Sequence, residues 1–264
     1  MKIGFIGGGN MAGAIVGGVL SSGMCKATDI CVCDKNADTL KKYADEIKIS
    51  TDNREAFFGD FIILAVKPQI LPDVLEEIKE LGIDLEKKVF VSIAAGITSE
   101  KIRSILGEKA KIVRVMPNTP ALVLEGMTVI SENDGTLTDD EFSGVIDIFN
   151  SVGKTKVLKE SQINTVIGIS SSSPAYVYML IEAMGDAGVR DGLTRDDAYY
   201  LAAQAVLGSA KMVLESGRHP GELKDMVCSP KGTTIEAVSE LEKRGFRTAI
   251  IEAIKKCNDR AKNM

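Results

Sequence analysis

The sequence contains a single histidine, His219, in 264 residues, so a metal site built from imidazole ligands is not expected. It has five cysteines, and their spacings match no metal-binding motif. Cys31 and Cys33 stand one residue apart in an apolar run, and Cys228 lies in a polar loop. We therefore predict that the chain holds no metal ion. The cysteines other than Cys228 are expected to be small residues of a reduced core.

The sequence also lacks an excess of basic residues. Its formal net charge is -5, which argues against a nucleic-acid partner. No apolar run approaches the roughly 20 residues that a bilayer helix needs, and glycines interrupt the apolar start of the chain, unlike a signal peptide. The hydrophobic fraction of 45% is enough for a core. We expect a cytoplasmic protein that acts on a small molecule.

The first part of the chain alternates between strand and helix patterns. Short apolar runs predict strands at residues 2–7, 30–33, 61–66, 89–93, 112–116, 127–130 and 156–158. Helical periodicity predicts helices at residues 10–21, 37–45, 68–80, 99–106 and 139–150. This order is typical of an α/β fold with a Rossmann-like, doubly wound and mostly parallel sheet.

After Lys159 the sequence contains helical patterns and no strand candidate. Thr194 followed by two aspartates predicts a helix start, and small residues between Ala198 and Met212 favour close helix–helix packing. We predict two domains, a dinucleotide-binding domain at residues 1–159 and an all-helical domain at residues 160–264. The helical domain is expected to bind substrate and to form a dimer.

A glycine-rich motif joins the first predicted strand to the first predicted helix. Residues 7–12 read GGGNMA, which matches G-x-G-x-x-A in the strand–turn–helix context of a dinucleotide site. Gly7 permits a tight turn, Gly9 lets phosphates approach the helix N-terminus, and Ala12 allows close packing. The alternative is a tight turn without a ligand, but the position after a strand favours a nicotinamide cofactor.

The end of the second predicted strand, Asp34-Lys35-Asn36, leaves the choice of cofactor open. An acid at this point hydrogen-bonds a ribose 2′-OH and repels the 2′-phosphate of NADPH. Lys35 and Asn36 favour the opposite choice, because they could receive that phosphate.

Three further stretches follow predicted strands, where ligands of such sheets lie. They are residues 65–68 (AVKP), residues 94–96 (AAG) and residues 116–120 (MPNTP). We interpret Lys67 as part of a cofactor-facing turn rather than as a catalytic amine. Asn118 is either a fixed hydrogen-bonding group near the nicotinamide or part of an ordinary turn.

The residues favour reduction of a C=N bond over reduction of a carbonyl. Carbonyl reduction usually needs a positioned acid, yet residues 160–184 contain no Lys, His or Arg, and His219 lies in a Gly/Pro-rich turn. A protonated imine brings its own proton. The loop Cys228–Thr234 (CSPKGTT) offers hydroxyls and backbone N–H groups to a carboxylate, and Thr234 could bond the nitrogen. The alternative is a loop that only joins two helices.

The segment HPGELKDMVCSPKGTTIEAVSELEKRGFR resembles the pyrroline-5-carboxylate reductase family. GISSSSPAYVYMLIEAM, VRVMPNTPALVLEGM and IGFIGGGNMAGAI extend the resemblance over the whole chain. It implies reduction of L-1-pyrroline-5-carboxylate to L-proline with NADPH or NADH, the last step of proline biosynthesis. It also implies an intertwined homodimer that often assembles into a decamer.

The resemblance, together with the residue patterns, assigns roles to individual positions. Thr234 is the predicted catalytic residue. The predicted substrate-binding residues are Glu160, Ser229, Gly232, Thr233 and Thr234. The predicted cofactor-binding residues are Ile6, Gly7, Gly8, Gly9, Asn10, Met11, Asp34, Lys35, Asn53, Ala65, Val66, Lys67, Pro68, Ile93, Ala94, Ala95 and Asn118.

Two positions depart from the family pattern, which has glycine where this chain has Ser171 and Lys231. A glycine at such a place can mark a positive φ, so the backbone at Ser171 is in question. Lys231 adds a cation to the anion-binding loop, and we expect it to point to solvent. Two other functions remain open: a cofactor-binding sensor without catalysis, and a 3-hydroxy acid dehydrogenase, which the missing lysine disfavours.

Overall fold

The computed structural model describes residues 1–44 and 46–262. The predicted helix at residues 37–45 ends in Asp45, which lies outside the described residues. The chain divides into two compact units, one of Met1–Ser172 with the C-terminal end from Cys257, and one of Ser173–Lys256. This geometric division does not decide the predicted domain boundary after Lys159, which stays a prediction.

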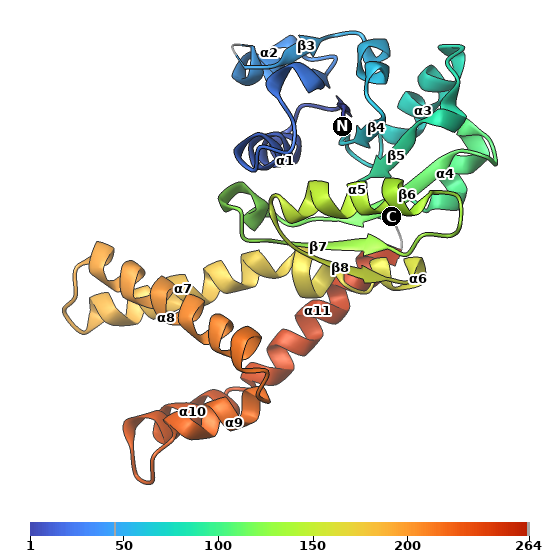
Figure 1. Ribbon diagram of the computed structural model, residues 1–264. Helices are drawn as coiled ribbons and strands as arrows, with labels where there is room; N and C mark the ends of the chain where they lie inside the picture. Colours follow the sequence, from blue (N-terminus) through green and yellow to red (C-terminus); the bar gives the residue numbers. More distant parts are fainter. Residues whose placement is uncertain (45, 263–264) are drawn as a thin grey trace. The chain divides into compact units, whose positions relative to one another are not determined.

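The first unit contains an eight-stranded sheet with the order β3-β2-β1-β4-β5-β6-β7-β8 (Figure 1). The strands are β1 (Ile3–Ile6), β2 (Ile30–Cys33), β3 (Lys48–Ser50), β4 (Phe61–Leu64), β5 (Val89–Ser92), β6 (Lys111–Met116), β7 (Gly126–Ser131) and β8 (Gly153–Leu158). Neighbouring strands pair in parallel except β6 and β7, which are antiparallel. The predicted mostly parallel, Rossmann-like sheet is confirmed.

Helices cover both faces of this sheet because its central strands are apolar on both sides. The helices are α1 (Asn10–Ser21), α2 (Ala37–Leu40), α3 (Leu71–Glu80), α4 (Ser99–Leu106), α5 (Asp139–Asn150) and α6 (Glu160–Ile163). Ile3 and Phe5 of β1 belong to one buried apolar cluster, with Ile15 of α1. Ile6 belongs to a second cluster, with Leu75 of α3. Alternate residues of one strand thus serve opposite faces, as in a doubly wound fold.

Three predicted elements need correction. Strand β3 was not predicted, because its Lys-Ile-Ser sequence is at most half-buried and carries no apolar run. Helix α3 begins at Leu71 rather than at Pro68, and the proline in its first turn is Pro72. Strand β8 begins at Gly153, three residues before the predicted start, because its exposed lysines hide the pattern.

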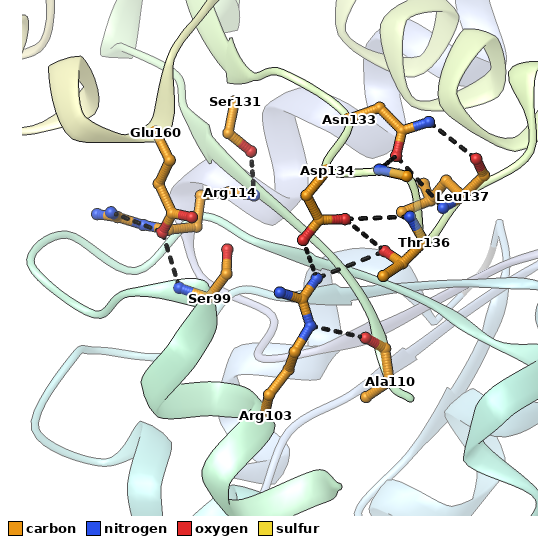
Figure 2. A network of polar contacts seen from close by, with 11 residues as sticks. Ser99, Arg103, Ala110, Arg114, Ser131, Asn133, Asp134, Thr136, Leu137 and Glu160 are labelled. Atoms are coloured by element: carbon orange, nitrogen blue, oxygen red, sulfur yellow. Dashed lines mark hydrogen bonds and ion pairs between the residues drawn. The ribbon is translucent and has the colours of Figure 1, made fainter. Parts of the chain in front are cut away.

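An ion pair joins helix α4 to a loop of the first unit (Figure 2). The guanidinium of Arg103 on α4 contacts the Asp134 carboxylate and donates to the carbonyl of Ala110 at 3.1 Å. Burial opposes ionisation of Asp134, but hydrogen bonds from Thr136 and from Arg103 outweigh it and hold the pKa of Asp134 below its usual value. The pair fixes the end of α4 against the loop between β7 and α5.

The second unit is helical, as predicted, and residues 173–256 contain no strand. Its helices are α7 (Ser173–Arg190), α8 (Arg195–Ser216), α9 (Pro220–Val227), α10 (Thr233–Lys243) and α11 (Phe246–Lys262), the last of which continues into the first unit. The predicted helix start at Thr194 is confirmed, because its hydroxyl accepts the Asp197 N–H at 3.2 Å. No described helix has the length and apolar character needed to cross a membrane.

Helices α7 and α8 pack closely through small residues. A Cβ on Gly185 would lie 2.5 Å from the ring of Tyr199, and one on Gly188 would lie 3.1 Å from the Cβ of Ala198. Part of the small-residue face predicted for self-association is therefore used within the chain. The unit still exposes large apolar side chains, such as Tyr200 at 72% and Leu214 at 83%. Apolar surface of this extent is typical of an oligomer interface.

Candidate functional site

The turn between β1 and α1 requires a glycine at its first position. Gly7 has a φ of +102°, and a Cβ there would lie 2.5 Å from the carbonyl oxygen of Ala65. The Gly7 N–H donates to the Cys33 carbonyl at 2.7 Å, and the Ala65 N–H donates to the Ile6 carbonyl at 2.8 Å. The carboxyl ends of β1, β2 and β4 therefore meet at this turn, as the glycine motif predicts.

The N-terminus of α1 is open. Its N-cap residue, Gly9, makes no side-chain capping bond, and the first turn contains no acid. A Cβ built on Gly9 would find no atom within 4 Å. Unpaired N–H groups above empty space suit a phosphate, so the residues fit the pyrophosphate of a dinucleotide.

A cavity of about 300 Å³ lies at these strand ends. The predicted residues that line it are Ile6, Gly7, Gly9, Asp34, Lys35, Asn53, Ala65, Val66 and Lys67. It is also lined by Thr39 of α2, by Val74 of α3 and by Ile70, the N-cap residue of α3. The sequence did not single out these three residues because none of them directly follows a strand. The predicted residues Gly8, Asn10, Met11, Pro68, Ile93, Ala94, Ala95 and Asn118 do not line this cavity.

Side chains from the segment after β2 hold the glycine loop. The Asp34 carboxylate accepts the Gly8 N–H at 2.8 Å and the Asn36 N–H at 2.9 Å. The Tyr43 hydroxyl donates to the Gly8 carbonyl at 2.9 Å. Burial raises the pKa of Tyr43, and the charge of Asp34 raises it further, so Tyr43 stays a neutral donor. Tyr43 is a loop-holding residue that the sequence did not reveal.

Asn118 has a structural role in the first unit. Its amide nitrogen donates to the Ser170 carbonyl at 2.9 Å, and its amide oxygen accepts the Met127 N–H at 2.9 Å. The side chain therefore joins the end of β6 to β7 and to the turn of π-helix at Ile167–Ser171. This geometry favours the alternative of an ordinary structural turn, and a contact with nicotinamide stays a prediction.

The backbone at Ser171, which the sequence left in question, does not have a positive φ. Among the described residues other than glycine, only Leu124 and Lys231 have a positive φ. Ser171 closes the π-helical turn instead, and its buried hydroxyl has no hydrogen-bond partner within the described chain.

Glu160 bridges two groups of the first unit (Figure 2). Its Oε1 accepts the backbone N–H of Ser99 at 2.8 Å and an N–H of the Arg114 guanidinium at 3.2 Å. The Arg114 side chain is only 2% exposed, and it also donates to Asn164 at 3.1 Å. Glu160 lines a cavity of about 290 Å³ with Arg114 and Asn164. Its contact with substrate stays a prediction. Arg114 was missed because it looked like one polar residue in a strand.

The loop Cys228–Thr234, called the hydroxyl loop from here on, lies in the second unit at the N-terminus of α10. Gly232 is the N-cap residue of α10. Because glycine has no side chain, it cannot cap the first N–H groups of the helix. Its own N–H donates to the Ser229 carbonyl at 3.0 Å, and a Cβ at this position would collide with the Ser229 hydroxyl. A side chain at position 232 would therefore displace the Ser229 hydroxyl. Thr234 lies in the first turn of the helix.

Lys231 has a φ of +58°, a left-handed conformation that favours glycine. The residue is exposed, as predicted for a lysine that points to solvent. A glycine would adopt this conformation without the cost that a side chain adds.

Comparison with known proteins matches both parts of the chain. Residues 160–264 match a model described as pyrroline-5-carboxylate reductase dimerisation, and residues 2–96 match one described as NADP oxidoreductase coenzyme F420-dependent. A pyrroline-5-carboxylate reductase of Escherichia coli is 49% identical over 100% of this chain and 98% of its own length.

Solved structures agree with this match. A pyrroline-5-carboxylate reductase from Coxiella burnetii is 36% identical, with a TM-score of 0.89 over 99% of this chain and 97% of that one. The corresponding protein of Plasmodium falciparum, solved with NADP bound, is 33% identical, with a TM-score of 0.88 over 100% of this chain and 97% of that one.

We predict that Glu160→Gln lowers the free energy of unfolding by about 1–3 kcal/mol, because it leaves the buried Arg114 guanidinium without a counter-charge. Chemical denaturation of the full chain measures this change. Glu100→Gln is the matched control, since Glu100 lines the same cavity and no contact joins it to Arg114. Equal stability of the two variants would show that the pair with Arg114 contributes nothing.

We predict that Lys231→Gly raises the free energy of unfolding by about 1 kcal/mol, because it removes the cost of a left-handed side-chain-bearing residue. Lys231→Ala is the control, since it removes the same charge and keeps that cost. Thermal unfolding compares the two variants. A glycine variant that is no more stable than the alanine variant would contradict a conformational cost at position 231.

Proposed function

Because the chain belongs to the pyrroline-5-carboxylate reductase family, we propose that it reduces L-1-pyrroline-5-carboxylate to L-proline with NADPH or NADH. The observation that carries this conclusion is the 49% identity over the whole chain. The chain is an oxidoreductase of proline biosynthesis, and its first unit has the Rossmann-like fold that such cofactors need.

The cofactor-binding residues support this proposal through backbone geometry. NAD(P)H supplies the hydride when it is bound. Gly7 and Gly9 keep the space above α1 free of side chains, and the open N–H groups of that helix suit the pyrophosphate. Ala65 and Val66 leave room at the end of β4, where Lys67 adds a positive charge to the cavity wall. Gly8, Asn10, Met11, Pro68 and residues 93–95 remain proposed contacts.

The hydroxyl loop supports substrate binding. We propose that Ser229, Gly232 and Thr233 donate to the substrate carboxylate, and that the Thr234 hydroxyl hydrogen-bonds the ring nitrogen. Uncapped N–H groups at the start of α10 suit a carboxylate. Glu160 is a further proposed substrate contact. Its Oε1 accepts both hydrogen bonds described above, and its Oε2 takes no part in them.

The reaction needs no protein acid for its first step. The iminium nitrogen of the substrate already carries a proton, and hydride adds to the adjacent carbon while the C=N π bond becomes the nitrogen lone pair. The resulting amine then takes a second proton from water. His219 is not needed as an acid, because its Nδ1 accepts the Gly221 N–H at 3.0 Å and caps α9. Its predicted structural role fits this geometry.

The chain carries a dimerisation module, and we propose that it forms a homodimer whose dimers assemble into a decamer. The exposed apolar side chains of the second unit support a homodimer. Light scattering of the purified chain tests this proposal. A monomer would contradict the dimer, and a dimer without larger species would contradict the decamer. We also propose a cytoplasmic location, which its five free cysteines favour.

The proposed reaction is tested by following cofactor oxidation with and without L-1-pyrroline-5-carboxylate, for NADH and NADPH separately. Oxidation that requires the imine and yields L-proline supports the proposal. Tight cofactor binding without turnover would instead favour a sensor.

We predict that Thr234→Ala lowers kcat/KM for the imine by about ten- to a hundredfold and leaves cofactor affinity unchanged. Loss of one hydrogen bond in the transition state costs on the order of 1–3 kcal/mol. Thr234→Ser, which keeps the hydroxyl, should retain most of the activity. An alanine variant with unaltered kcat/KM would remove Thr234 from the mechanism.

A further inference from the structure

We propose that Asp34 makes the cofactor site select NADH over NADPH, because its carboxylate is fixed at the point where the two cofactors differ. The inference rests on the proposed function and names the cofactor that this chain prefers. Asp34 directly follows β2, and it lines the cavity of about 300 Å³ together with Gly7 and Gly9. In this fold, an acid at the end of the second strand receives the ribose 2′-OH, which in NADPH carries a phosphate.

The carboxylate is held in place from both sides. Its Oδ2 accepts the Gly8 N–H at 2.8 Å, and its Oδ1 accepts the Asn36 N–H at 2.9 Å. The Asp34 N–H itself donates to the Ser50 carbonyl of β3 at 3.1 Å. The side chain cannot turn away from an incoming phosphate without leaving two backbone donors unpaired. Each oxygen keeps a lone pair, so the same fixed carboxylate can accept hydrogen bonds from ribose hydroxyls.

Lys35, the cation that the sequence offers to a 2′-phosphate, is already paired. Its Nζ lies 2.8 Å from Oε1 of Glu77 on α3. The buried amide of Asn53 also donates to both oxygens of Glu77, each at 3.3 Å, which holds this acid beside Lys35. The ion pair holds Lys35 beside Glu77, whereas no ion pair joins Asp34 to a cation in the described part of the chain. We therefore give Asp34 more weight than Lys35 in the choice of cofactor.

Two more lysines follow in the same segment, and of these two Lys41 has an acidic partner while Lys42 bonds a neutral carbonyl. Lys41 pairs with Asp38 at 2.7 Å, and Lys42 donates to the Gly9 carbonyl at 3.1 Å. Lys67 lies at the end of β4 and adds its charge to the wall of the same cavity. Lys67 is therefore not part of the segment after β2, where this fold receives the ribose 2′-OH.

The test is the affinity of the full chain for NAD⁺ and for NADP⁺, measured by titration calorimetry without substrate. We expect NAD⁺ to bind at least about tenfold more tightly, because a fixed carboxylate repels the added phosphate. Asp34→Asn keeps the shape of the side chain and removes its charge, and its one amide oxygen can accept only one of the two backbone N–H groups. It should narrow the ratio of the two dissociation constants by about tenfold. The ratio of kcat/KM values for NADH and NADPH should change in the same direction.

Glu76→Gln is the matched control, because it removes an exposed charge next to Glu77 on α3 and does not line the cavity. It should leave the ratio unchanged. Raising the salt concentration provides a further test, because salt screens the repulsion between Asp34 and the added phosphate. The ratio of the two dissociation constants should narrow for the unaltered chain and stay the same for Asp34→Asn.

The inference is overturned if the unaltered chain binds NADP⁺ as tightly as NAD⁺. It is also overturned if Asp34→Asn leaves the ratio of the two dissociation constants unchanged. A chain that prefers NAD⁺ but does not reduce the imine contradicts the proposed function and leaves this inference standing. The two failures are therefore distinguishable.

Discussion

The close approach of Gly7 to Ala65 is the constraint on which the cofactor site depends. No side chain fits between them, because a Cβ on Gly7 would lie 2.5 Å from the Ala65 carbonyl oxygen. This contact lets the ends of β1, β2 and β4 meet, and it places Asp34 beside the Gly8 N–H. The proposed site for the shared part of the cofactor is thus made of backbone. The proposed selection between the two cofactors depends on one side chain, Asp34, that the same backbone fixes.

Much of the fold could be predicted because the relevant signals are local. Strands such as β1 and β4 are buried on both faces and give continuous apolar runs, and the glycine motif follows from neighbouring residues alone. Strand β3 gave no such run. The pair of Arg114 with Glu160 joins positions 46 residues apart, and the partners of Asn118 lie as far away as Ser170. Such contacts depend on how the elements pack, which no local pattern records.

The hydroxyl loop shows how far local chemistry leads to function. Its glycine, its hydroxyls and the uncapped start of α10 follow from the sequence, and together they suit a carboxylate. Lys231 has a left-handed backbone that glycine would adopt at lower cost. Because the substrate brings its own proton, hydrogen-bonding groups are sufficient for the site, and the absence of a Lys or His acid from residues 160–184 is consistent with imine reduction.

Direct hydride transfer to the imine carbon is the central claim. It is tested most directly by supplying NADH labelled with deuterium at the transferable position of nicotinamide C4 and examining the proline formed by mass spectrometry. The account predicts that each proline carries one deuterium, at the ring carbon C5 that was part of the C=N bond. Oxidation of NADH that leaves proline unlabelled, or that forms no proline, would contradict it.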